Sequence, residues 1–245
     1  MKKNKVLTVI IFLVLSFVMP KNLKSQIMEI GVTGGASYYI GDINPSKHFS
    51  QSQLAYGGAL RYYQNLRWAF RLQYSRFNLT SSDEVVAYRP ERNLAFKSKV
   101  DDLAFMAEFN FFDYWTGSRK SYVSPYIFAG VSVFRFNSTD LNGRELQFRQ
   151  NEGVRYNTFS WSIPFGVGVK YSVTKRLGAT LDWRMHKAFT DYIDDIEGYY
   201  LDNPTMQRGN GSSHMFGYNN DWYGILGLTI SYRFNLPSNV ICHYM

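Results

Sequence analysis

The residues best suited to chemistry in this 245-residue chain are a histidine, an aspartate and two serines in strand-like segments. His186 and Asp182 could supply the base and the acid of a Ser/His/acid set for lipid hydrolysis. Ser162 or Ser231 would then be the nucleophile. However, four residues of strand rise place His186 about 13 Å from Asp182, which is too far for a direct hydrogen bond. Interior packing or an interfacial position explains His186 more simply, so we predict no catalytic residues and no enzyme.

Metal and phosphate chemistry have no stronger basis in the sequence. His48 and His214 lie in long polar segments, and His243 stands beside the single cysteine, Cys242. A Cys/His pair with no further ligand makes a weak metal site. The stretch GDINP, residues 41–45, lacks the spacing of a calcium loop and reads as a turn. We therefore expect no metal, no cofactor and no small-molecule substrate.

The segments that contain Ser162, Asp182, His186 and Ser231 share one pattern of residue types. WSIPFGVGVKYSV, residues 161–173, alternates apolar or aromatic residues with small or polar ones. A period of two is typical of a strand whose faces meet different environments. With seven further segments of this kind, the predicted strands are 28–40, 54–63, 67–75, 101–111, 122–134, 158–173, 177–186 and 221–234.

The connections between these strands alternate in length. The short ones are 64–66, 113–120 and 174–176, and the long ones are 41–53, 80–98, 137–157 and 190–220. This sorting is typical of an outer-membrane meander, and a closed barrel satisfies every backbone group in hydrocarbon. The sequence therefore predicts an all-β fold, an eight-stranded antiparallel transmembrane β-barrel with short periplasmic turns and long extracellular loops.

The two faces of the strands should then meet lipid and lumen. Aromatic residues make up 18% of the chain, and they fit girdles at the two membrane interfaces. The predicted girdle comprises Tyr38, Tyr62, Trp68, Tyr74, Trp161, Tyr171, Trp183, Trp222 and Tyr232. A soluble lipocalin-like barrel is the alternative, but its outward face would be mostly Gly, Ala and Ser. The membrane barrel is favoured, with the outer-membrane lipids as its surroundings.

The inward face carries charges of both signs among small residues. An eight-stranded barrel has room inside for side chains and little else, and buried charges must pair. We therefore predict a plug of salt bridges and no pore. Its predicted members are Glu29, Arg61, Arg67, Arg71, Asp102, Glu108, Lys170, Asp182, Arg184 and Arg233.

Residues 1–25 have the pattern of a secretory signal peptide. Three early lysines precede the apolar run VLTVIIFLVLSFV, residues 6–18, and cleavage is expected near Ser25–Gln26. The alternative is a membrane anchor, for which the run is short. Cleavage lowers the formal net charge from +8 to +3, because the segment holds five lysines and no acid. The basicity is thus no argument for a nucleic-acid partner.

The last strand ends in an aromatic residue, Phe234, and resembles the signal by which the outer-membrane insertion machinery recognises barrels. The barrel should therefore span 26–234, and residues 235–245 should form a periplasmic tail. Cys242 has no intramolecular partner in an oxidising compartment. We predict an intermolecular disulfide at Cys242, with a free thiol on a frayed tail as the alternative.

Three stretches of the chain carry a family resemblance. They are MEIGVTGGASYYIGDINP at 28–45, AYGGALRYYQNLRWAFRLQYSRFNLTSSD at 55–83, and SIPFGVGVKYSVTKRLGATLDW at 162–183. In this order they resemble the PorG-type outer-membrane proteins of Bacteroidota, which belong to the type IX secretion system. The resemblance spans nearly the whole mature chain. Its most distinctive part, Y-x-G-D-x-N-P, is carried by Tyr39, Gly41, Asp42, Asn44 and Pro45.

The resemblance implies a function without catalysis. Such a barrel binds a periplasmic ring of a PorK-like lipoprotein and a PorN-like protein, and it supports export of cargo with C-terminal signals and, in gliding species, motility. The PorK-like lipoprotein would then be the disulfide partner of Cys242. A stand-alone barrel, either a narrow pore or a lipid-modifying enzyme, is the alternative.

Overall fold

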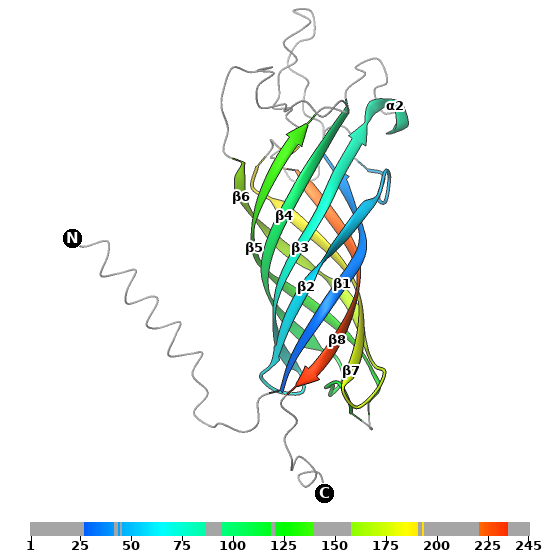
Figure 1. Cartoon of the computed structure of the whole chain (residues 1–245), viewed down its shortest axis with the longest axis vertical. Coiled ribbons are helices and arrows are strands. Elements are labelled where there is room, and N and C mark those ends of the chain that lie inside the picture. The colour runs from blue at the N-terminus through cyan, green and yellow to red at the C-terminus, as the bar shows by residue number, and fades with distance from the viewer. Residues whose placement is uncertain are drawn as a thin grey trace, which may run out of the picture.

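A closed ring of strands forms the body of the protein (Figure 1). The computed structural model describes residues 27–41, 44, 46–86, 95–118, 121–139, 158–190, 193 and 221–234. Within these residues, eight strands pair antiparallel with their sequence neighbours, and β1 closes the ring against β8. The strands are β1 Ile27–Ile40, β2 Gln53–Tyr63, β3 Trp68–Ser82, β4 Ala95–Asn110, β5 Val123–Thr139, β6 Phe159–Ser172, β7 Leu177–Ala188 and β8 Trp222–Phe234. The predicted eight-stranded antiparallel barrel is confirmed.

The barrel has two unlike ends. The turn end holds residues 64–67, 111–118, 121–122 and 173–176, and here β1 begins and β8 ends, with Met28 paired to Phe234. The loop end lies opposite and carries α2, Asp83–Val86, at the top of Figure 1. No helix among the described residues is long and apolar enough to cross a membrane. The predicted signal peptide and the tail with Cys242 lie outside the described residues.

The outer wall is apolar along most of its height. Exposed aliphatic and aromatic side chains point outward from every strand: Ile30, Val32, Leu60, Leu72, Leu103, Phe105, Ile127, Val131, Val167, Val169, Leu181, Leu228 and Ile230. Soluble monomers do not expose a continuous apolar surface of this extent. Lipid must therefore cover this wall, as the sequence predicts.

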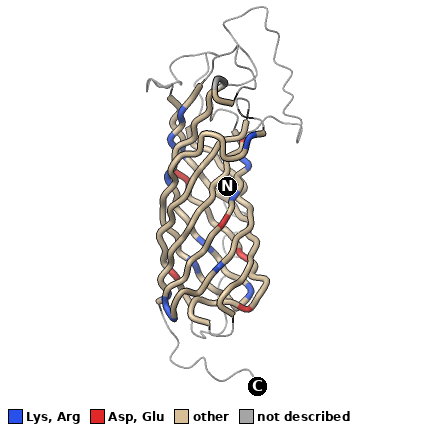
Figure 2. Tube along the Cα trace, turned by 90° about the vertical axis from the view of Figure 1, so that its right-hand side faces the viewer, with Lys and Arg blue, Asp and Glu red and all other residues tan. Residues whose placement is uncertain are grey.

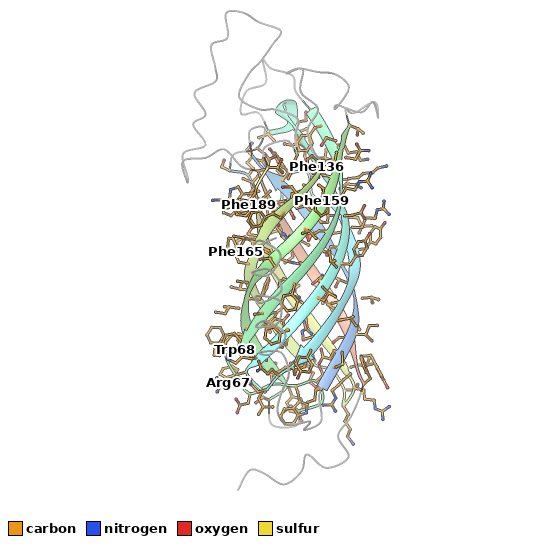
Figure 3. The ribbon with its side chains drawn as sticks, turned by 90° about the vertical axis from the view of Figure 1, so that its left-hand side faces the viewer. Arg67, Trp68, Phe136, Phe159, Phe165 and Phe189 are labelled. Carbon is orange, nitrogen blue, oxygen red and sulfur yellow. The ribbon has the colours of Figure 1, made fainter. Side chains whose placement is uncertain are left out.

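Aromatic residues mark both edges of that wall. Trp68 lies near the turn end in Figure 3, whereas Phe159 and Phe189 lie near the loop end. Trp161 stacks on Phe189, with ring centroids 4.3 Å apart. Rings of this kind prefer the interface between hydrocarbon and water. The predicted girdle is present, with one exception at Tyr38.

Tyr38 points outward but is fully buried, contrary to the prediction that it meets lipid. Its ring lies against Phe49, and its hydroxyl is 3.1 Å from His48 Nδ1. Trp183 Nε1 also donates a hydrogen bond of 2.8 Å to that hydroxyl. Gly224 makes the approach possible, because a Cβ there would lie 2.1 Å from the Tyr38 ring. The chain after β1 therefore folds back over the outer wall.

The strands β3, β4 and β5 continue further toward the loop end than the sequence predicted. Parts of the expected loops 80–98 and 137–157 are strand in the structure. The physical reason is a reversal of the two faces. In these extensions polar residues such as Lys99 and Arg135 point outward, and apolar residues such as Phe77 and Phe136 are buried inside. A prediction based on apolar outward residues therefore ends each strand where the two faces exchange their residue types.

Lipid contact can be tested at Val167, midway along β6 and 51% exposed. Val167→Arg should lower the free energy of unfolding by about 2–4 kcal/mol, because it places a charge in hydrocarbon. Urea unfolding in phospholipid vesicles measures this. The matched control is Val85→Arg in α2, at a site that is 61% exposed. The control should change stability by less than about 0.5 kcal/mol. If the two variants were equally stable, this face would not meet lipid.

Candidate functional site

The barrel interior near the turn end contains a carboxylate surrounded by cations. Glu108 on β4 lies 2.9 Å from Arg61 Nε, 2.8 Å from Arg71 Nε and 2.6 Å from Lys170 Nζ. The cations come from β2, β3 and β6, and all four side chains are buried. A buried charge is tolerated only where opposite charges compensate its lost hydration. Glu108 therefore links strands from opposite sides of the wall.

The network continues from Glu108 in two directions. Toward β1, Arg61 Nη1 pairs with Glu29 Oε2 at 2.9 Å, and Glu29 also accepts hydrogen bonds from Ser231 and Thr116. Toward β7, Arg71 Nη1 pairs with Asp182 Oδ2 at 2.5 Å. The chain of alternating charges thus crosses the whole lumen.

Aromatic rings fill the space around these charges. Tyr126 donates a hydrogen bond of 3.1 Å to Asp182, and Lys170 Nζ lies 4.5 Å from the Tyr126 ring centroid. The guanidinium of Arg71 lies 4.8 Å from the Phe128 ring. A Cβ on Gly168 would be 2.6 Å from Tyr126, so the absence of a side chain there gives the ring its place. Cation–π contacts of this kind strengthen when water is excluded.

The predicted interior charges are confirmed as buried, with one error. Arg67 is about half exposed, and its Nε pairs with Asp113 at 2.5 Å in the turn end. The prediction counted Arg67 as the first residue of a strand, but β3 begins at Trp68. Arg67 instead belongs to the turn, where its Nη1 donates to the carbonyl oxygen of Phe111.

The mouth at the turn end is closed by residues 111–118. The segment turns inward, and its Tyr114 and Thr116 are buried, with Thr116 donating a hydrogen bond to Glu29. Gly117 has φ of 94° and donates its N–H to Ser172 Oγ at 2.7 Å. A Cβ on Gly117 would lie 2.3 Å from the carbonyl oxygen of Lys175. What the sequence predicts as a simple turn therefore also seals the barrel.

At the loop end a hydrophobic core fills the lumen. It contains Tyr39, Ala55, Phe77, Leu79, Phe96, Val100, Phe134, Phe136, Ala188, Ile193, Tyr223 and Ile225. Tyr223 contacts both Phe77 and Phe134, with centroids 5.4 and 5.7 Å away. The interior thus changes from charged to apolar along the barrel axis, and both parts are packed.

The structure brings Ser162 and His186 together, but without Asp182. Ser162 Oγ lies 3.1 Å from His186 Nδ1, and Asp102 Oδ2 lies 3.7 Å from the same nitrogen. A Ser/His/acid set needs the acid and the nucleophile on opposite ring nitrogens. Here His186 Nε2 has no hydrogen-bond partner among the described residues, and the ring stacks on Tyr223 at 4.4 Å. The arrangement is that of a buried polar layer.

The Y-x-G-D-x-N-P motif fastens the chain after β1 to the start of β8. Tyr39 donates a hydrogen bond of 2.5 Å to Asp221, and Asn44 Nδ2 donates to the carbonyl oxygens of Tyr39 and Lys47. Gly41 N–H also donates to the Asn44 carbonyl oxygen. A Cβ on Gly41 would lie 1.9 Å from the Tyr39 hydroxyl, so glycine is required. Asp42 and Pro45, the other two motif residues, lie outside the described residues.

Within the described part of the chain, no three His, Cys, Asp or Glu side chains are arranged to hold a metal ion. His214, Cys242 and His243 fall outside that part.

The apolar outer wall, the charged interior and the unbroken antiparallel ring together define a small outer-membrane β-barrel protein. The chain belongs to the family described as "Domain of unknown function (DUF6089)", whose model matches residues 4–243. No curated protein matches the chain.

Several solved outer-membrane barrels share this architecture. The attachment invasion locus protein Ail of Yersinia pestis, in complex with the heparin analogue sucrose octasulfate, has 12% identity and a TM-score of 0.46 over 86% of this chain and 100% of that one. Neisserial surface protein A has 17% identity and a TM-score of 0.47 over 86% and 98%. The N-terminal barrel of Pseudomonas aeruginosa OprF has 15% and 0.42 over 86% and 98%. The assignment to the outer membrane rests on the apolar wall itself.

The contribution of the network to the free energy of unfolding can be measured at Glu108. Glu108→Gln should lower the free energy of unfolding by about 3–5 kcal/mol, because it leaves Arg61, Arg71 and Lys170 without their shared counter-charge. The matched control is Asp113→Asn, which breaks the exposed pair with Arg67 and should cost less than about 1 kcal/mol. Urea unfolding in vesicles compares the two. Equal losses would contradict a buried, water-free network.

Proposed function

We propose that the protein is a non-enzymatic outer-membrane component of the type IX protein secretion and gliding machinery. In this role the barrel anchors a periplasmic ring of a PorK-like lipoprotein and a PorN-like protein to the outer membrane. The observation that carries the proposal is the filled lumen, because a barrel packed along its interior acts through its surfaces. The resemblance of the sequence to PorG-type proteins names the machinery.

The turn end is suited to holding a partner. Residues 111–118 fold into the mouth, where Gly117 donates a hydrogen bond to Ser172 at the end of β6 and lies against Lys175 in the turn at 173–176. Arg67 ties the turn between β2 and β3 to the same segment through Asp113. The three turns therefore present one connected surface, which with the long loops outside the cell faces the periplasm. A rigid surface loses little conformational entropy on binding.

The two alternative functions have less support. A narrow pore needs a water path, whereas the lumen is occupied by the Glu108 network, the 111–118 segment and the core at the loop end. A lipid-modifying enzyme needs a nucleophile open to lipid, whereas Ser162 and His186 are fully buried. Both observations favour the anchor.

The anchor is tested by recovering partners from native outer membranes. An affinity-tagged full chain, extracted in mild detergent, should bring down both the PorK-like lipoprotein and the PorN-like protein, identified by mass spectrometry. Untagged cells provide the background. Recovery of the barrel without either ring protein would contradict the anchor.

The tail adds a second prediction for the same partner. We expect Cys242 to form a disulfide with the PorK-like lipoprotein, because an exported chain with a single cysteine has no internal mate. On non-reducing gels of outer membranes, the wild type should shift upward by the mass of the partner. Reductant and Cys242→Ser should each abolish the shift. A monomeric wild-type band would rule out the covalent link and leave the non-covalent anchor intact.

Because the lumen is filled, we also expect the barrel not to conduct ions. The purified wild-type protein should give no stable single-channel currents in planar bilayers, because ion pairs and aromatic rings occupy its interior. A porin added to the same bilayer serves as the positive control. Reproducible unitary currents from the wild type would support the pore instead.

A further inference from the structure

The outer faces of β3, β4 and β5 change character abruptly toward the loop end. On β4 the outward residues run from Phe105 and Leu103 to Asp101 and Lys99. On β3 Tyr74 is followed by Arg76, and on β5 Val133 is followed by Arg135. Three adjacent strands thus replace apolar outward side chains with charged ones at the same point of the sheet. This is where the wall leaves hydrocarbon and meets lipid headgroups.

The strand register gathers the cations into one cluster. Asp101 is paired with Arg76 on one side and with Arg135 on the other. Lys99 follows on β4, between Asn78 and Asn137. A cavity of about 250 Å³ lies at this cluster and is lined by Arg76, Lys99, Asp101, Arg135, Phe136 and Asn137.

The charges in this cluster do not balance. Asp101 is already engaged, since Arg76 Nε lies 3.4 Å from its carboxylate and Tyr74 donates a hydrogen bond of 2.5 Å to it. Lys99 and Arg135 form no ion pair with any residue in the described ranges. In Figure 2 several Lys and Arg positions follow one another along one side of the upper barrel, and others lie on the opposite side and lower down. The cluster therefore has positive charge available to an anion.

We propose that this cluster binds the phosphate groups of the phosphorylated glycolipid that forms the outer leaflet of the outer membrane. Arg76, Lys99 and Arg135 supply the charge-assisted donors, and Asn137 supplies a neutral donor for sugar or phosphate oxygens. The acyl chains of the same lipid lie along Tyr74, Leu103 and Val133 below. This site is independent of the ring-anchoring role and requires only that the loop end faces outside.

The turn end offers a natural comparison. There Arg67 is neutralised by Asp113, and Arg176 donates a hydrogen bond of 3.0 Å to the hydroxyl of Tyr232. Both guanidinium groups are therefore already engaged by neighbouring side chains. The proposed site therefore distinguishes the two edges of the apolar wall.

The test is lipid binding to the full chain in detergent micelles, measured by native mass spectrometry. The probes are diphosphoryl lipid A, the same glycolipid with both phosphates removed, phosphatidylglycerol and inorganic phosphate. The site variant is Arg76→Gln/Lys99→Gln/Arg135→Gln. The matched control, Arg67→Gln/Lys175→Gln/Arg176→Gln, removes the same number of charges at the turn end. Heat-modifiable migration on gels verifies that each variant is folded.

Diphosphoryl lipid A should bind the wild type and the control variant with similar affinity, and the site variant about tenfold or more weakly. The dephosphorylated glycolipid should bind all three equally weakly. Lys99→Gln alone, which leaves Asp101 with its partners, should show an intermediate loss.

Three results would overturn the proposal. One is equal binding of diphosphoryl lipid A to the wild type and the site variant. Another is equal affinity of the wild type for phosphatidylglycerol, which would mean that any anionic lipid suffices. The third is displacement of lipid A by inorganic phosphate at the same concentration, which would assign the cavity to free phosphate.

Discussion

The barrel depends on the compensation of one buried carboxylate. Glu108 meets Arg61, Arg71 and Lys170 within 3 Å, and none of these side chains reaches solvent. Removing four charges from water is costly, so the network exists only as a complete set. Its members come from β2, β3, β4 and β6. Their contacts therefore hold these four strands at fixed distances from one another across the lumen. The closed interior and the rigid turn end follow from this constraint.

Membrane and water impose opposite demands along the same strands. Inside the hydrocarbon layer the wall is apolar outside and charged inside, as Phe105 and Glu108 show on β4. Beyond that layer the order reverses, and Lys99 points outward while Val100 is buried within the core at the loop end. The backbone alternation never breaks, since only the side-chain types exchange places. The same strand therefore faces lipid along one part of its length. Further along, its outer face meets water and its inner face covers the apolar core.

Alternation predicted what each face contains, but not which residues meet. The sequence places Glu29, Arg61 and Glu108 in the interior, because each lies on the strand face opposite the apolar one. The pairing of Ser162 with His186 depends on the register between β6 and β7, which the sequence does not specify. The sequence pattern does not predict the extensions of β3, β4 and β5, because their apolar residues face inward. Tyr38 was misplaced because the chain after β1 covers it, a tertiary contact that no local pattern encodes.

Spin-label accessibility can measure the reversal of faces on β4 directly. In a Cys242→Ser background, single labels replace Phe105, Met106, Lys99 and Val100 of the barrel in bilayers. We expect the label at 105 to be relaxed by oxygen dissolved in lipid, and the label at 99 by a water-soluble nickel complex. The labels at 106 and 100, which point into the packed interior, should be reached by neither. Access of the nickel complex to 106, or of lipid-dissolved oxygen to 99, would contradict this arrangement of the two faces.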